Sequence, residues 1–284
     1  MGIENIGETN LPGIKVVGHI DLSKFEKFKK EPNYEKYLTF LKDKALPDLA
    51  RDANSEFANF LEIDGRISLE GRESVSDKVL VDAQEEGYSK EAGKSLNEWR
   101  RDTEKNPATL TEMALTVMLY KYLKEYFIVA RASDYDDYNN GVDQVLIYKP
   151  TGEVVCGFDE VIGNSGDDGG LKKAAKLEKI MARGGAQIKY GAKMQDGILV
   201  RSEVRNIPAF YMSLSKAELG ELLESLQING DKTSLVEDRI FAKLLNSLEA
   251  QAAGQNLSAD LKIKTNSALE KMRACFDSHD KLAA

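Results

Sequence analysis

The segment from Thr109 to Val161 constrains the fold most, because a long apolar helix pattern leads directly into three β-rich runs. In TLTEMALTVMLYKYLKEYF, residues 109–127, apolar residues recur at helical spacing, which predicts a largely buried helix. FIVARA, VDQVLIYK and EVVCGFDEV follow, separated by the turn-like DYDDYNNG and by Pro150-Thr151-Gly152. We therefore expect three consecutive strands, of which the second and third form an antiparallel hairpin.

Three acidic residues stand at informative places in these elements. Glu112 lies in the predicted helix, Asp143 begins the second strand, and Asp159 lies near the end of the third. Because the strands of a hairpin run in opposite directions, the start of one lies beside the end of the next. We therefore expect Asp143 and Asp159 to lie close together. Carboxylate oxygens suit Mg²⁺ and Mn²⁺, so the three acids are candidate ligands of one divalent metal ion.

This order of acids resembles the PD-(D/E)XK nuclease superfamily, the restriction-endonuclease-like proteins. The matching residues are Glu112, Gly141-Val142-Asp143 and Phe158-Asp159-Glu160-Val161. A helix pattern at 171–183 and a strand pattern at 207–214 complete the family's α-β-β-β-α-β order. The resemblance therefore covers residues 107–214 and implies an α/β (α+β) fold with a small mixed sheet.

The resemblance also implies an activity. In the superfamily the acids hold Mg²⁺, so Asp143, Asp159 and Glu112 become the expected metal ligands and catalytic residues. The cofactor is then Mg²⁺ or Mn²⁺, and the enzyme is a phosphodiester hydrolase acting on nucleic acid, with DNA favoured over RNA. By the same resemblance, the product carries a 5′-phosphate.

The chain departs from the family at one position. Family members carry a lysine two residues after the second acid, where it orients or activates the attacking water, and Val161 stands there in this chain. Some members supply that lysine from elsewhere in the fold. The candidates here are Lys172, Lys173, Lys176 and Lys189, and Lys189 and Lys176 are the favoured catalytic lysines. The departure leaves a second hypothesis open: a nuclease-like fold without catalysis that serves as a nucleic-acid or protein interaction module.

Charge is unevenly distributed along the chain. The formal net charge is −8, which argues against a nucleic-acid-binding surface covering the whole protein. Residues 171–205, however, contain nine basic and three acidic residues. A solvated charged helix would explain this run, but its place after the acidic hairpin also suits a surface that holds a nucleic acid. The expected nucleic-acid contacts are Lys172, Lys173, Lys179 and Arg183.

Each candidate also has a purely structural interpretation. Thr109-Leu110-Thr111-Glu112 fits a capping box, in which Glu112 would bond back to the Thr109 amide. A carboxylate buried at Asp159 could pair with a lysine of the next helix. Alternation along the strand predicts that Glu160 faces solvent rather than acting as an outer-sphere ligand. A third hypothesis is therefore that the acids are structural and the family resemblance is coincidental.

The rest of the chain is mainly helical in pattern. We expect an irregular arm at 1–33, a helical region at 34–106, the nuclease-like core at 107–214 with an inserted hairpin at 185–203, and a helical region at 215–284. A break is expected near Pro47 and a helix stop at Gly87. Capping boxes are expected at Ser215–Glu218 and Ser234–Glu237.

Composition excludes several other classes. A hydrophobic content of 42% fits a globular protein, and no apolar run approaches a membrane span or a signal peptide, so a cytoplasmic protein with no membrane partner is expected. Two cysteines and two histidines form no zinc pattern, and both thiols are expected to be reduced. The absence of a GxSxG motif disfavours serine-hydrolase chemistry. Substrate polarity, sequence preference and oligomeric state stay open.

Overall fold

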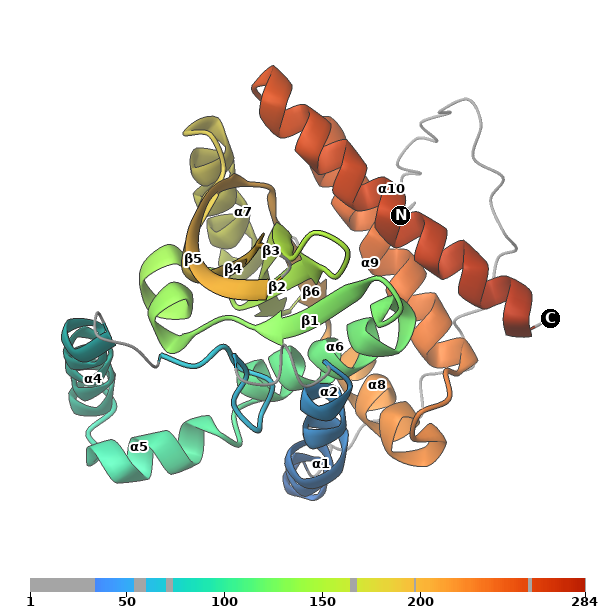
Figure 1. Cartoon of the computed structure of the whole chain (residues 1–284). Helices are drawn as coiled ribbons and strands as arrows, with labels where there is room; N and C mark the ends of the chain where they lie inside the picture. The colour runs from blue at the N-terminus through green and yellow to red at the C-terminus, as the bar shows by residue number, and fades with distance from the viewer. Residues whose placement is uncertain are drawn as a thin grey trace, which may run out of the picture. The chain divides into compact units, whose positions relative to one another are not determined.

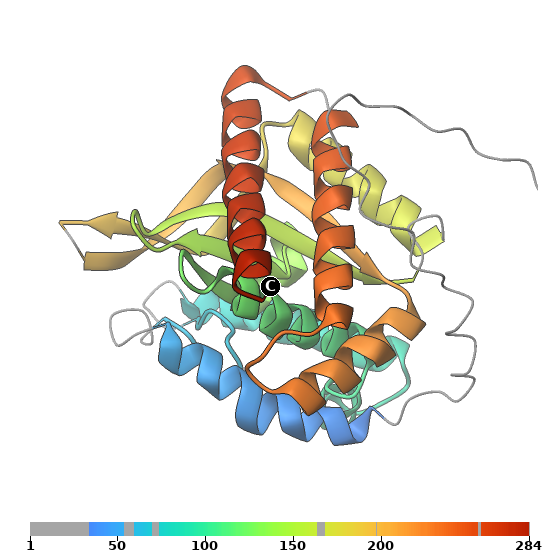
Figure 2. The same cartoon turned by 90° about the vertical axis from the view of Figure 1, so that its right-hand side faces the viewer.

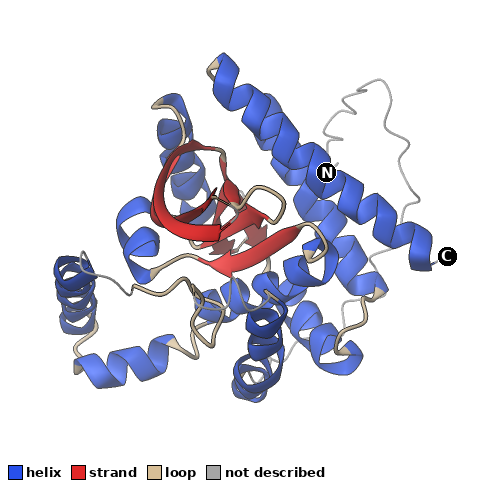
Figure 3. Ribbon diagram, viewed as in Figure 1, coloured by secondary structure: helices blue, strands red, loops and turns tan. Residues whose placement is uncertain are grey.

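A four-stranded sheet and its covering helices form the centre of the fold, as Figures 1 and 3 show. The computed structural model describes residues 34–53, 60–69, 74–163, 168–196, 198–254 and 257–283, so the predicted arm at 1–33 lies outside the described residues. The elements that carry the predicted order are α6 (Pro107–Leu123), β1 (Phe127–Arg131), β2 (Gln144–Tyr148), β3 (Glu153–Ile162), α7 (Asp168–Ala182) and β6 (Ala209–Leu214).

The strands of this sheet are ordered β1-β2-β3-β6. β1, β2 and β3 pair in antiparallel fashion, whereas β6 pairs with β3 in parallel. A parallel pair requires a crossover connection, and α7 lies in that connection. The predicted mixed α/β fold with a small mixed sheet is therefore confirmed.

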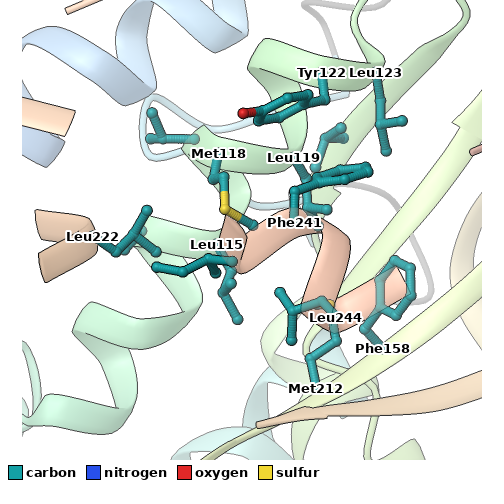
Figure 4. Close-up of a cluster of buried hydrophobic side chains, with 14 of the residues drawn as sticks. Leu115, Met118, Leu119, Tyr122, Leu123, Phe158, Met212, Leu222, Phe241 and Leu244 are labelled. Carbon is teal, nitrogen blue, oxygen red and sulfur yellow. The ribbon is translucent and has the colours of Figure 1, made fainter. Parts of the chain in front are cut away.

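Helix α6 is buried because almost every side of it is apolar. Asn106 caps its first turn by accepting a hydrogen bond from the Ala108 amide at 2.9 Å, and Pro107 starts the helix. Figure 4 shows Leu115 and Met118 of α6 in one cluster with Phe158 of β3. Each such buried side chain contributes about 1.5–3 kcal/mol to stability. The cluster fixes α6 against the sheet.

The inserted hairpin forms a separate two-stranded sheet of β4 (Ala186–Gln195) and β5 (Ile198–Ile207).

The helical region after β6 comprises α8 (Lys216–Asn229), α9 (Leu235–Gly254) and α10 (Ala259–Ala283), and Figure 2 shows α9 and α10 side by side. The capping box at Ser215 and Glu218 is present. At α9, Ser234 accepts from the Glu237 amide, while the buried Glu237 carboxylate pairs with Lys121 at 2.9 Å.

One of two expected helix boundaries is present. A π-helical turn (Leu41–Ala45) separates α1 (Glu35–Phe40) from α2 (Leu46–Asp52), so two α-helices meet next to Pro47, as predicted. The position of Pro47 at the start of α2 suits a residue without an amide hydrogen. The stop expected at Gly87 is wrong, because α4 (Ser74–Glu91) continues through it, and α5 (Leu96–Thr103) begins after a Ser95–Glu98 capping box.

Two composition-based expectations concern cysteines and membranes. Cys156 and Cys275 are both free and buried, as predicted. None of the helices in the described ranges combines the length and apolarity needed to cross a bilayer.

Candidate active site

Asp143 and Asp159 lie together at one end of the β2–β3 hairpin. The register pairs Gln144 with Phe158, which sets the two aspartates opposite each other. The Asp143 amide donates to the Phe158 carbonyl at 2.7 Å, and the Asp143 Oδ2 atom accepts from the Glu160 amide at 2.6 Å. The predicted proximity of the two acids is confirmed. Both side chains are only 9% exposed, so the pair is recessed.

The cation between these acids is Lys173, from the first half of α7. Its ammonium group contacts the Asp159 Oδ1 atom and the Glu160 carbonyl, and lies 3.8 Å from the Asp143 Oδ2 atom. Burial lowers the pKa of Lys173, but Asp143 and Asp159 raise it by more, so the ammonium stays charged. Lys176 is more distant, at 3.9 Å from the Asp159 Oδ2 atom.

Glu160 is buried, which contradicts the expectation that it faces solvent. It follows Phe158 by two residues and so points to the side of the sheet covered by α6, while β2 and β6 flank its strand. Neither of its carboxylate oxygens has a hydrogen-bonding partner among the described residues. Burial, followed by the nearby Asp143 carboxylate, raises the pKa of Glu160 well above its usual value.

Asp137 adds a further carboxylate to the site. It belongs to a π-helical turn (Asp136–Asn140) that connects β1 to β2. Burial, with Glu112 second, raises its pKa to about 6. Burial also raises the pKa of Asp143 well above its usual value, and the negative charges of Asp137, Glu112 and Asp159 contribute in that order. The site therefore has a surplus of buried negative charge.

Glu112 does not form the predicted capping box, because α6 begins two residues before Thr109 and places Glu112 in its second turn. Its Oε2 atom instead accepts a hydrogen bond from Arg131 at 2.8 Å and lies 3.7 Å from the Arg66 guanidinium. Arg66 also lies 3.7 Å from Asp137. These arginines hold Glu112 beside the other acids while neutralising part of its charge.

Helix α6 and strand β2 are tied together next to the acids. The Gln144 side-chain amide donates to the Glu112 carbonyl at 2.6 Å and also to the Thr116 hydroxyl. Gln144 directly follows Asp143 in the chain, so this link sets the distance between Asp143 and the helix that carries Glu112.

Lys189, one of the two expected catalytic lysines, is directed elsewhere. Its ammonium pairs with the Asp77 Oδ2 atom of α4 at 2.6 Å and lies 4.8 Å from the Tyr135 ring centroid. Lys173, a candidate for the displaced lysine that was not favoured over Lys189 and Lys176, is the lysine that reaches both Asp143 and Asp159.

The remaining basic residues of α7 line a groove next to the acids. This groove encloses about 660 Å³ and also has Asn139, Asn140 and residues 185–187 on its walls. No Asp or Glu is among the described residues that line it. Its basic residues are Lys172, Lys176, Lys179 and Arg183. Three of the four residues expected to contact nucleic acid therefore lie in or beside one groove, and the fourth, Lys173, reaches the acids.

The fit of the site to a metal ion depends on the arrangement and the chemistry of its donor groups. Within the described ranges, no three His, Cys, Asp or Glu side chains are arranged to hold one. The donor chemistry nevertheless suits a hard divalent cation, because the acids offer only carboxylate oxygens and both oxygens of Glu160 lack a partner. The candidate ligands are Asp143 and Asp159, with Glu160 behind them and Glu112 held by arginines.

Several members of the site were not predicted from the sequence. Arg131 ends the apolar strand FIVAR, where a buried arginine signals a buried acid nearby. Arg66 and Asp137 carry no comparable local signal. Comparison of the chain with models of known families, with curated proteins and with solved structures found no match.

Proposed function

We propose that this protein is a divalent-metal-dependent nuclease that hydrolyses phosphodiester bonds, with DNA as the favoured substrate. The proposal rests on one observation, the position of the Lys173 ammonium between Asp143 and Asp159. An acid pair with an adjacent lysine is the combination that the PD-(D/E)XK resemblance implies. Lys173 then takes the role that Val161 cannot perform, from α7 instead of from β3.

Each residue has a distinct task in this proposal. Asp143 and Asp159 hold the ion, and Glu160 adds negative charge behind them. A bound Mg²⁺ or Mn²⁺ supplies Lewis-acid stabilisation of the phosphate and lowers the pKa of a water molecule. Lys173 would orient the attacking water by donating a hydrogen bond to it, and Glu112 would serve as a third ligand or help to position that water. Lys176 lies where it can contact the scissile phosphate.

The surplus of carboxylates supports the proposal on electrostatic grounds. Burial, and then repulsion between neighbouring carboxylates, raises the pKa values of Asp143 and Glu160. A divalent cation would relieve this repulsion. A protein that used these residues only for structure would gain stability from fewer charges. Retaining an unpaired carboxylate at Glu160 favours a functional explanation over a structural one.

The alternative function is an interaction module without catalysis. It is favoured by Val161 and by the arrangement of the described side chains, in which no three acids converge as a metal site. In this alternative, Lys173 permanently neutralises the aspartates, and the groove along α7 binds nucleic acid or protein without cleaving it.

Cleavage assays separate the two functions. The wild type, Asp143→Ala and Lys173→Met are incubated with single- and double-stranded DNA and RNA in Mg²⁺, Mn²⁺ or EDTA, and the products are resolved on a gel. Lys193→Met, on strand β4, is the matched control because it removes an exposed lysine. We expect cleavage by the wild type and the control only, with rates at least about 100-fold lower in the other two variants. Binding without cleavage by the wild type would support the interaction module.

A further inference from the structure

We infer that the groove along α7 binds the sugar-phosphate backbone of a single nucleic-acid strand over about five nucleotides. The inference deepens the proposed function. It rests on that function for the claim that the bound strand leads to Asp143 and Asp159. The groove is defined by Lys172, Lys176, Lys179 and Arg183, with Asn139 and Asn140 opposite.

The basic residues of the groove are regularly spaced. Lys172, Lys176, Lys179 and Arg183 are separated by four, three and four positions, so they follow one face of α7. From first to last they span about 16 Å at 1.5 Å per residue. Four consecutive phosphates, the number in a strand of about five nucleotides, would give each cation one partner. A continuous backbone can therefore meet each cation in turn.

The recessed position of the acids favours a single strand over a duplex. The Asp143 and Asp159 side chains are each 9% exposed, so a rigid duplex lying on the surface would not reach them. A flexible strand can bend inward to reach them.

Lys176 links the groove to the acids. It lines the groove and also lies 3.9 Å from the Asp159 Oδ2 atom. The left-handed backbone of Gly141 makes room for it, because a Cβ atom there would stand 2.0 Å from the Lys176 ammonium. A phosphate held by Lys176 is therefore adjacent to Asp159, and the strand continues from the groove to the site.

The test measures binding separately from cleavage. Fluorescence anisotropy in EDTA follows labelled dT3, dT5, dT10 and a blunt 20-base-pair duplex with the wild type, and then with K172Q/K179Q/R183Q. The matched control is K193Q/K264Q/K271Q, which removes the same charge from a different cavity, between β5 and α10. Thermal unfolding of both triple variants verifies that they are folded.

We expect affinity to rise from dT3 to dT5 and then to level off, and dT10 to bind at least about 10-fold more tightly than the duplex. Between 50 and 200 mM salt, the affinity of the wild type for dT10 should fall about 50-fold, because four phosphate contacts are screened. The affinity of K172Q/K179Q/R183Q, the α7 variant, should fall only about 3-fold, because one contact is left. The control variant should behave like the wild type. Equal duplex binding, or equal loss in the control, would overturn the inference.

These outcomes are distinguishable from failure of the nuclease proposal. If the groove binds as expected but the wild type cleaves no substrate in Mg²⁺ or Mn²⁺, the single-strand groove stands and the catalytic proposal fails. If the wild type cleaves but the α7 variant binds dT10 as the wild type does, the catalytic proposal stands and the groove inference is refuted.

Discussion

Replacing Glu160 by Gln should stabilise the protein. The substitution keeps the shape of the side chain, removes a buried negative charge, and introduces an amide that can donate to the adjacent Asp143 carboxylate. Glu160 is 6% exposed and neither of its carboxylate oxygens has a hydrogen-bonding partner among the described residues. A buried polar group without a partner costs about 1–3 kcal/mol, and more when it is charged. We expect Glu160→Gln to raise the free energy of unfolding by about 2 kcal/mol.

The stability gained by Glu160→Gln should increase with pH. The pKa of Glu160 is raised in the folded state, first by burial and then by Asp143. Its contribution to stability is therefore present in acid and is lost as the pH rises through the folded-state pKa. Glu160→Gln removes this loss, so its advantage over the wild type should be large at pH 8 and small at pH 4.

Thermal unfolding in EDTA measures the effect. A change of about 2 kcal/mol corresponds to a midpoint increase of about 4–8 °C for a chain of this size. Glu153→Gln, an exposed position on the same strand, is the control and should change stability by less than about 0.5 kcal/mol. A lower midpoint for Glu160→Gln at pH 8, or a gain that does not change with pH, would refute the idea that this carboxylate is buried and unpaired.

Lys173→Met should lower the free energy of unfolding in EDTA by about 1–2 kcal/mol, because Asp143 and Asp159 lose their cation. This loss of stability should be smaller in Mg²⁺, and thermal unfolding with and without the ion measures the difference. Lys121→Met should lower the free energy of unfolding by about 3–5 kcal/mol, because the fully buried Glu237 carboxylate loses its cation. Urea unfolding measures this change, and an unchanged midpoint would show that the ion pair does not stabilise the protein. Gly141→Ala should cost about 1–2 kcal/mol through its left-handed backbone, and it should weaken dT10 binding by displacing Lys176.

Much of the fold could be predicted from local sequence patterns. The apolar face of α6 and the β-rich runs identify these elements, because helical and strand periodicities are visible within a few residues. The turn at Pro150 and Gly152 makes the second and third strands a hairpin, and that hairpin brings Asp143 beside Asp159. Gly87 does not end α4, because a single glycine inside a helix costs only about 1 kcal/mol.

The composition of the candidate site depended on contacts between distant parts of the chain. Lys173 reaches Asp159 because α7 packs against β3 and β6, and Arg66 reaches Glu112 from another region altogether. Glu160 is buried because α6 covers its face of the sheet and β6 pairs with its strand, which no pattern within β3 records.

The sequence by itself therefore determined the elements, their order and the meeting of two acids across a hairpin. Only the tertiary structure decided which lysine faces those acids, which carboxylates are buried, and where α7 forms a groove. The physical reason is the sequence distance over which each effect acts. Periodicity and turn chemistry depend on residues that are close in the sequence, whereas burial and ion pairing depend on groups that folding brings together from far apart in the chain.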